Sequence, residues 1–146
     1  MDIISKFTHE NDQKKIGLMK KLENNPFSLK SRFKSFGYAF NGIVKTVKNE
    51  HNFWIHLVVM FLVIAFGFVF QVSVTEWVFL VFSIGFVLTA EIFNSAIEVL
   101  TDLVSPEHNP KAGLTKDMAA GAVLVSAVTA AIIGLIIFAP KLLELL

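Results

Sequence analysis

Three long apolar segments dominate the pattern of hydrophobic and polar positions along the chain. They run from residue 53 to 70, from 77 to about 104 and from 118 to about 139. Each is close to or longer than the roughly 18 to 20 residues that a helix needs to cross about 30 Å of hydrocarbon. Because only the residues QVSVTE separate the first two segments, we expect an antiparallel helical hairpin there. The pattern predicts an all-α integral membrane protein with three transmembrane helices per chain.

A different pattern precedes the first span. From residue 29 to 50, apolar and basic side chains fall on opposite faces of a helix, and Ser28 is the expected N-cap. The apolar face consists of Leu29, Phe33, Phe36, Phe40, Ile43, Val44 and Val47. A basic amphipathic helix beside a hairpin is expected to lie in the cytoplasmic interface of the membrane. We predict a polar N-terminal extension at 1–28, ended by the turn signal Asn24-Asn25-Pro26, and a membrane domain at 29–146.

Composition and charge support this division. The chain has 146 residues, is 54% hydrophobic and has a mean hydropathy of +0.63, which is too apolar for an ordinary soluble domain of this size. It has no cysteine, which excludes thiol chemistry and disulfides. Most of its 13 Lys and Arg residues precede His51, and two lie between the second and third spans. The positive-inside rule therefore places the N-terminus and that loop in the cytoplasm, and the C-terminus outside. We expect no cleaved signal peptide, because residues 1–28 hold no continuous apolar run.

Polar residues interrupt the second apolar segment in a regular pattern. Glu91, Asn94, Glu98 and Asp102 are spaced three, four and four residues apart, which places them on one helical stripe. Ionisable groups at bilayer depth cost several kcal/mol each unless they face a polar cavity or a partner. A solvated helix end would explain Asp102 but not Glu91, which lies about 21 Å along the helix from Trp77. The row descends from acyl depth to the cytoplasmic water, which suits a reaction between a membrane lipid and a soluble nucleotide.

A second polar pair precedes the third apolar segment. Alone, Lys116 and Asp117 would be a positive-inside anchor with an acid at a helix start, in a helix expected to begin near Thr115 after the flexible Gly113. The small residues that follow allow close helix packing, which would bring the pair against the second span. Tyr38 stands among the lysines of the amphipathic helix, either as an interfacial ring or as a wall of a cytoplasmic site.

Taken together, the segments AEIFNSAIEVLTDLV and KDMAAGAVL resemble the prokaryotic diacylglycerol kinase family, which includes the undecaprenol kinases. The family signature is a Glu-x-x-Asn-(Ser or Thr)-Ala-x-Glu-x-x-x-Asp run, closed by Lys-Asp-(Met or Ile) and small residues. The matching residues here are Glu91, Asn94, Ser95, Ala96, Glu98, Asp102, Lys116, Asp117 and Met118. The resemblance covers about residues 30 to 140, in the same order of surface helix, three spans and cytoplasmic loop.

The resemblance implies a lipid kinase of the bacterial cytoplasmic membrane that uses ATP and Mg²⁺ and assembles as a homotrimer with shared sites. It implies that Glu91 is the general base, that Asn94 orients Glu91 or the lipid hydroxyl, and that Glu50 and Glu98 hold the metal. The residues expected to bind ATP are Tyr38, Glu50, Glu98, Asp102, Lys116 and Asp117. The physical requirements agree, because phosphoryl transfer depends on positioning and charge neutralisation, and Mg²⁺ is typically held by one or two carboxylates plus substrate phosphates.

The sequence departs from the family pattern at places that bear on the substrate. His56 stands where one branch carries a second Glu, and its NFWIH context resembles the undecaprenol kinases, although that branch usually has Arg where Trp54 stands. In the second loop, Glu107-His108-Asn109 replaces the common Glu-Tyr-His. We therefore expect undecaprenol rather than diacylglycerol as the lipid, with diacylglycerol as the alternative, and His56, Glu91 and Ser95 as the residues that meet it.

Two other classes of protein remain as alternatives. Rows of intramembrane acids also line ion paths, so a small cation channel or transporter subunit is one, and a structural subunit whose partner satisfies the acids is the other. An ion path needs polar residues across the whole bilayer, whereas the outer half of the second span, VFLVFSIGF, offers almost none. The absence of a GxxxxGK[ST] loop excludes a P-loop nucleotidase. We expect no nucleic-acid partner, and the kinase is favoured.

Overall fold

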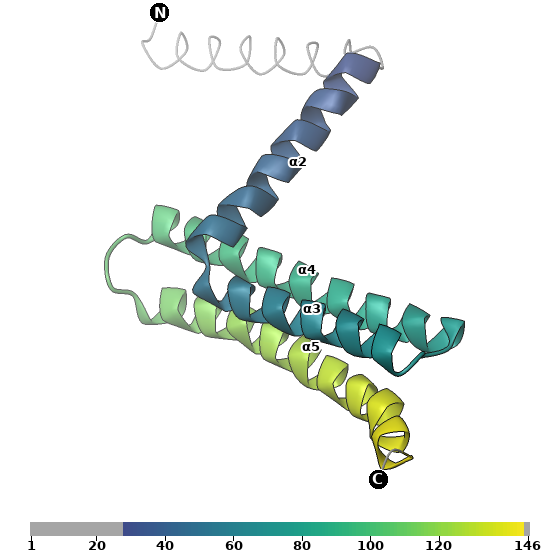
Figure 1. Ribbon diagram of the computed structural model, residues 1–146. Coiled ribbons are helices and arrows are strands. Elements are labelled where there is room, and N and C mark those ends of the chain that lie inside the picture. Colours follow the sequence, from purple (N-terminus) through teal and green to yellow (C-terminus); the bar gives the residue numbers. More distant parts are fainter. Residues whose placement is uncertain (1–27, 145–146) are drawn as a thin grey trace, which may run out of the picture. The chain divides into compact units, whose positions relative to one another are not determined.

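The structure is a computed structural model that describes residues 28–144, all of whose regular elements are helices (Figure 1). It divides the chain into two units, one up to Ala39 and one from Phe40 onward, which are described separately. The N-terminal extension predicted at 1–28 lies outside the described residues apart from Ser28.

Helix α2 spans Leu29–Asn49 and corresponds to the helix predicted at 29–50. Ser28 acts as its N-cap, as expected, because its Oγ accepts a hydrogen bond from the Ser31 backbone N–H at 3.4 Å. In the part of α2 before Phe40, the side chains are exposed, and the Lys34 Nζ lies 5.7 Å from the centre of the Tyr38 ring. This cation–π contact between neighbours on one helix turn stabilises the polar face locally.

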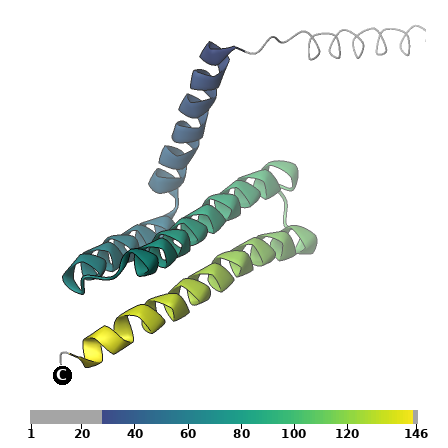
Figure 2. The same cartoon turned by 90° about the vertical axis from the view of Figure 1, so that its right-hand side faces the viewer.

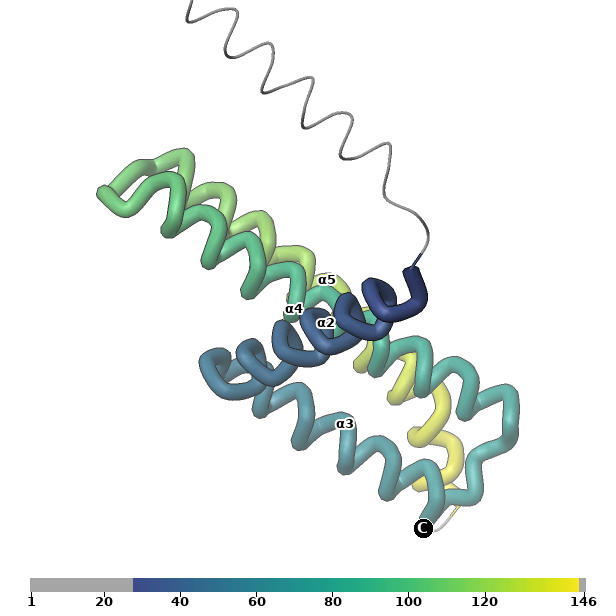
Figure 3. The backbone as a smooth tube through the Cα atoms, turned by 90° about the horizontal axis from the view of Figure 1, so that it is seen from above, coloured from purple at the N-terminus to yellow at the C-terminus, as the bar shows by residue number. Residues whose placement is uncertain are grey.

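The second unit contains three helices, α3 (His51–Val69), α4 (Val74–Val104) and α5 (Pro110–Leu143), which run in alternating directions (Figures 1 and 2). All three are long and apolar enough to cross a membrane, which confirms the predicted spans. The most extensive packing is between α4 and α5, and α4 also packs against α3. Because α3 has 19 residues and α4 has 31, α4 and α5 continue together beyond the start of α3 (Figure 3).

The bundle has two ends that differ in chemistry. The end that carries the α3–α4 turn is called here the turn end, and the end that carries the α4–α5 loop and the start of α3 is called the loop end. The main hydrophobic cluster lies at the turn end, where Val72, Leu80 and Ile137 are buried together. Three phenylalanines extend it: Phe66 and Phe138 have ring centres 6.2 Å apart, and Phe70 lies 5.9 Å from Phe138. The fold is thus closed by apolar packing at the turn end.

Both connections differ from the sequence-based boundaries because polar caps start the helices early. Helix α4 begins at Val74, before Trp77, because Ser73 and Glu76 form a reciprocal capping box. Helix α5 begins at Pro110, and the predicted start near Thr115 is wrong. Asn109 caps that helix by accepting a hydrogen bond from the Lys111 N–H at 2.9 Å. Gly113 therefore lies inside α5 and is not part of a flexible loop.

A close contact at the turn end makes one glycine indispensable. Gly67 is buried against the indole of Trp77, and a Cβ added there would lie 2.5 Å from a ring carbon. We predict that Gly67→Ala lowers the free energy of unfolding by about 1 to 3 kcal/mol, because the ring and both helices must shift. The measurement is the unfolding midpoint of the detergent-solubilised protein. Gly85→Ala is the matched control, since its added Cβ meets nothing within 4 Å. Equal midpoints for Gly67→Ala and the wild type would contradict this packing.

Candidate active site

The polar row predicted from the sequence lies along one stripe of α4 and becomes more exposed toward the loop end. Glu91 is 2% exposed, Asn94 7% and Ser95 5%. Glu98, one turn further, is partly exposed, and Asp102 is exposed. The predicted descent of the row from a buried acid to a solvent-facing one is therefore present. No hydrogen bond or ion pair of the Glu91 carboxylate is found among residues 28–144.

Asn94 connects the buried part of the row to its exposed part. Its Nδ2 donates a hydrogen bond to Glu98 Oε1 at 3.0 Å, while its Oδ1 is buried and has no partner within the described part of the chain. The contact orients a carboxylate oxygen of Glu98. It differs from the expectation that Asn94 orients Glu91 or a hydroxyl, although the unpartnered Oδ1 remains able to accept a hydrogen bond from a hydroxyl. The Ser95 Oγ donates to the Glu91 backbone carbonyl at 3.0 Å, which leaves its oxygen as an acceptor only.

The start of α3 supplies a second set of polar side chains to the same place. Helix α3 packs against α4, and the charges of His56, Glu50 and Glu98 act electrostatically on Glu91, so these three side chains lie within electrostatic range of its carboxylate. Glu50 occupies the N-cap position of α3, yet its side chain makes no capping hydrogen bond. Its carboxylate is thus available to a ligand, and it is partly exposed, as is His56.

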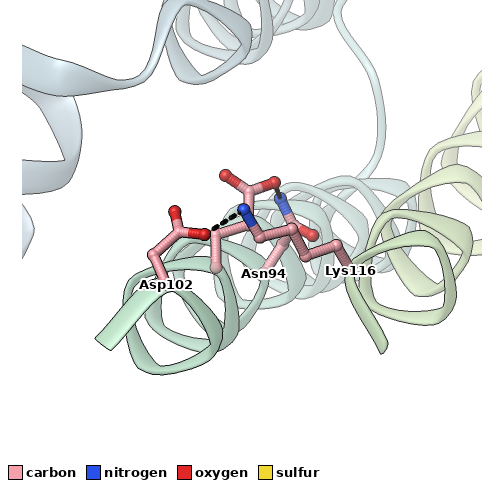
Figure 4. A network of polar contacts seen from close by, with 4 residues as sticks. Asn94, Asp102 and Lys116 are labelled. Atoms are coloured by element: carbon pink, nitrogen blue, oxygen red, sulfur yellow. Dashed lines mark hydrogen bonds and ion pairs between the residues drawn. The ribbon is translucent and has the colours of Figure 1, made fainter. Parts of the chain in front are cut away.

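An ion pair between α4 and α5 forms the loop-end side of the site. The Lys116 Nζ lies 2.5 Å from Asp102 Oδ1 (Figure 4). The pair holds the Lys116 ammonium of α5 beside Asp102, the most exposed acid of the row on α4. Asp117, the next residue, is exposed. The structure therefore brings Lys116 to the predicted site through the packing of α4 against α5.

Further candidate residues belong to the first unit and to the α4–α5 loop. Tyr38 belongs to the first unit, where its side chain is 62% exposed. In the α4–α5 loop, the exposed Glu107, His108 and Asn109 line a small polar hollow. The Asn109 Oδ1 is engaged in capping α5. Of the candidate nucleotide residues, Lys116 and Asp102 are in direct contact.

The donor set of the site suits a magnesium ion that is shared with a phosphate ligand. Among the described residues, no group of three or more His, Asp or Glu side chains could hold a metal alone. Mg²⁺ typically takes one or two carboxylates and completes its coordination with waters and substrate phosphates. Glu50 and Glu98 provide two carboxylates within electrostatic range of Glu91, and one oxygen of Glu98 is already oriented by Asn94. The residues present thus fit a phosphate-bound Mg²⁺.

Three features of the site were not predicted from the sequence. The Asn94–Glu98 hydrogen bond is a contact between positions i and i+4, a spacing that could have indicated it. The Lys116–Asp102 pair joins residues 14 positions apart, and no local pattern indicates that contact. An apolar pocket that reaches His56 was also missed. Its signal is the recurrence of alanine and glycine along one face of the third span.

Comparison with known proteins agrees with this arrangement. A family model described as prokaryotic diacylglycerol kinase matches residues 37–138. The undecaprenol kinase of Bacillus subtilis (strain 168) is 44% identical over 110 residues, covering 75% of this chain and 89% of that protein. A diacylglycerol kinase of Escherichia coli (strain K12) is 31% identical over 111 residues, which cover 76% of this chain and 91% of that protein. A diacylglycerol kinase of Synechocystis is 33% identical over 113 residues, which cover 77% of this chain and 65% of that protein.

Proposed function

The chain belongs to the prokaryotic diacylglycerol kinase family, and we propose that it transfers the γ-phosphoryl group of ATP directly to the hydroxyl of a membrane lipid. The observation that carries the proposal is the buried, unpaired Glu91 gathered with Glu50, Glu98 and His56 at one end of a membrane-spanning bundle. An unpaired acid in such a place is expensive, and functional sites are where such costs are retained.

Glu91 acts as the general base in this proposal. It is the deepest acid of the row and therefore the one that meets a hydroxyl arriving from the bilayer, whose proton it accepts as the phosphoryl group is transferred. Asn94 supports the reaction from one turn away: its Nδ2 orients Glu98, and its free Oδ1 faces the buried side of the row, where it can hold the lipid hydroxyl. The Ser95 hydroxyl already donates a hydrogen bond to the Glu91 backbone carbonyl, so in this proposal Ser95 meets the lipid only as a hydrogen-bond acceptor.

The remaining acids and Lys116 serve the nucleotide. Glu50 and Glu98 would hold Mg²⁺, which neutralises phosphate charge when bound. Lys116 supplies a fixed positive charge to the phosphates, and Asp102 holds its ammonium in position before they arrive. Asp117 and Tyr38 complete the proposed ATP site. Phosphoryl transfer requires mainly positioning and charge stabilisation, and these groups supply both.

We propose undecaprenol as the lipid rather than diacylglycerol. The relative named undecaprenol kinase shares 44% of its residues with this chain over 89% of its length, whereas the diacylglycerol kinases share 31% and 33%. His56, which acts on Glu91, supports the choice, because an imidazole near the base alters charge and shape where the lipid hydroxyl must arrive. Diacylglycerol remains the alternative substrate.

The proposal includes the placement of the protein in the membrane. The protein resides in the bacterial cytoplasmic membrane, with its loop end facing the cytoplasm, where ATP is found, and its C-terminus on the outer side. Residues 29–146 form the kinase domain, 1–28 an extension, and α2 lies on the membrane surface through its apolar face. Several chains assemble in this proposal, since one bundle leaves the partly exposed Glu50 and Glu98 without enough protein walls to enclose a nucleotide, and the number three rests on the family resemblance. The ion-path alternative is disfavoured by the family match and by the apolar cluster that fills the turn end.

The first prediction concerns Glu91. We expect Glu91→Gln to lower turnover by about 10² or more while ATP still binds, because a general base is lost. The free energy of unfolding of the same variant should be higher by about 1 kcal/mol or more, seen as a higher denaturant midpoint, because a neutral amide is cheaper to bury than an unpaired acid. The exposed Glu144→Gln is the control for both measurements. Near-normal turnover in Glu91→Gln would exclude Glu91 as the base.

The second prediction concerns the metal. Glu98→Gln and Glu50→Gln should each shift the magnesium dependence of ATP binding to concentrations about tenfold or more higher, because one carboxylate ligand of very few is lost. The exposed Glu144→Gln should leave the titration unchanged. Magnesium curves that coincide with the wild type for both variants would place the metal elsewhere.

The third prediction tests the substrate. Undecaprenol and diacylglycerol compete for the purified protein in the same mixed micelles with labelled ATP and magnesium, and the two phosphorylated lipids are separated and counted. We expect a several-fold higher kcat/KM for undecaprenol. A higher value for diacylglycerol would reverse the choice of lipid and leave the lipid kinase in place. Phosphorylation of neither lipid would reject the proposed function.

A further inference from the structure

An apolar pocket of about 210 Å³ lies between α3, α4 and α5 and extends from the turn-end cluster to His56. Each helix contributes one face to it, at helical spacing. Helix α3 contributes Val59, Met60 and Val63, and α4 contributes Leu80, Val87 and Leu88. The pocket is therefore a built feature of the three-helix interior and not a gap at a helix end.

The face that α5 presents to the pocket explains why the space exists. It consists of the small residues Ala127, Ala130, Ala131 and Gly134. Small residues in membrane helices usually let two backbones approach closely. Here α5 packs mainly against α4, and α3 does not fill the space opposite the small residues. A Cβ added to Gly134 meets nothing within 4 Å, so the space beside it is open.

The two ends of the pocket differ. At the turn end it is closed by Phe66 and Phe138, whose rings contact each other edge to face. At the other end stands His56, and Leu88 lies one turn before Glu91 on α4. The pocket therefore ends beside His56 and within about one helical turn of the proposed base along α4. A hydrocarbon chain in the pocket would end in a hydroxyl at the site of chemistry.

The size of the pocket limits what it can hold. A cavity of about 150 Å³ accommodates benzene, with its six carbons. In proportion, about 210 Å³ accommodates about eight or nine carbon atoms, which is less than two isoprene units. Val59 and Phe66 are about half exposed along the side of the pocket, so the rest of a longer chain can leave into the bilayer there.

The polarity of the pocket distinguishes between the two candidate lipids. In a polyprenol, pure hydrocarbon follows the hydroxyl-bearing carbon, whereas diacylglycerol carries two esters within three carbons of its hydroxyl. Beyond His56, the one polar side chain that lines the pocket is Ser83, and its hydroxyl already donates to the Phe79 carbonyl at 2.7 Å. Ester oxygens in the pocket would lose hydrogen bonds to water without gaining any, which is costly.

We propose that this pocket binds the isoprene units nearest the hydroxyl of a polyprenol and thereby selects a polyprenol over diacylglycerol. The proposal rests on the lipid kinase function proposed above. It assigns lipid selection to residues in the middle of the bundle, away from the groups that bind ATP. The face of α5 that carries Ala130 and Gly134 is thus a specificity determinant. The isoprene units farther from the hydroxyl contribute little to the selection.

The test fills the pocket from Gly134. Gly134→Leu should reduce kcat/KM for undecaprenol about tenfold or more, because head-end carbons lose their burial, while the KM for ATP stays unchanged. A three-unit prenol should show the same fold loss, because only its first units occupy the pocket. The matched control is Ala139→Leu, on an exposed position of the same helix that does not line the pocket. An unfolding midpoint for Gly134→Leu at or above that of the wild type verifies that the fold is intact.

A second measurement reports binding without turnover. A three-unit prenol with a photoreactive diazirine on its second unit should label peptides from α3 and α5 that line the pocket, and Gly134→Leu should lose the labelling. Wild-type kcat/KM for undecaprenol in Gly134→Leu, or labelling that persists in it, would overturn the pocket while leaving the kinase function intact. An equal loss with diacylglycerol would show that the pocket takes an acyl chain and would overturn the selection. Failure of the wild type to phosphorylate any lipid would reject the function itself.

Discussion

A carboxylic acid buried inside a membrane-spanning helix bundle is the constraint around which this chain is organised. Glu91 is 2% exposed and has no ion-pair partner in residues 28–144, although an ionisable group at such depth costs several kcal/mol. That cost has to be met by packing elsewhere. The cluster around Val72, Leu80 and Ile137 lies at the opposite end of the bundle and provides it. The bundle therefore divides into an apolar end that holds the helices together and a polar end that is free to bind ligands.

The caps of the helices extend the same division. The Ser73–Glu76 capping box fixes the start of α4, and Glu76 also pairs with Lys141 of α5 at 3.2 Å, so the turn end is closed by polar contacts as well as by apolar ones. At the loop end, in contrast, Glu50 stands at an N-cap without using its carboxylate for capping. Because the Glu50 carboxylate makes no capping hydrogen bond, it can bind another partner. The buried Oδ1 of Asn94, which has no partner among residues 28–144, can likewise accept a hydrogen bond from a ligand.

The sequence alone was sufficient for the features that depend on local periodicity. The three spans, the helix at 29–50 and the stripe from Glu91 to Asp102 follow from spacing along one helix, and the structure has all of them. Contacts between helices were not predictable in this way, because they depend on how α4 and α5 meet. The Lys116–Asp102 pair and the pocket opposite Gly134 are of this kind. The predicted start of α5 near Thr115 is wrong because Asn109-Pro110 combines an N-cap with a first-turn proline and starts the helix earlier.

The spacing within the row matches what a direct transfer requires. The seven residues from Glu91 to Glu98 correspond to about 10 Å along α4. A base within hydrogen-bond reach of a hydroxyl, a hydroxyl oxygen about 3 to 3.5 Å from the phosphorus, and a carboxylate that binds a metal on the phosphate occupy a similar length. Asn94 stands between the two acids and is bonded to Glu98. In the proposed reaction, the amide would stand at the level of α4 where the transferred group passes, with one donor bonded to Glu98 and a buried Oδ1 that has no partner among residues 28–144. In the proposed reaction a single helix can thus hold both substrates in line, provided that Glu91 stays buried and that Glu98 and Asp102 stay accessible to solvent.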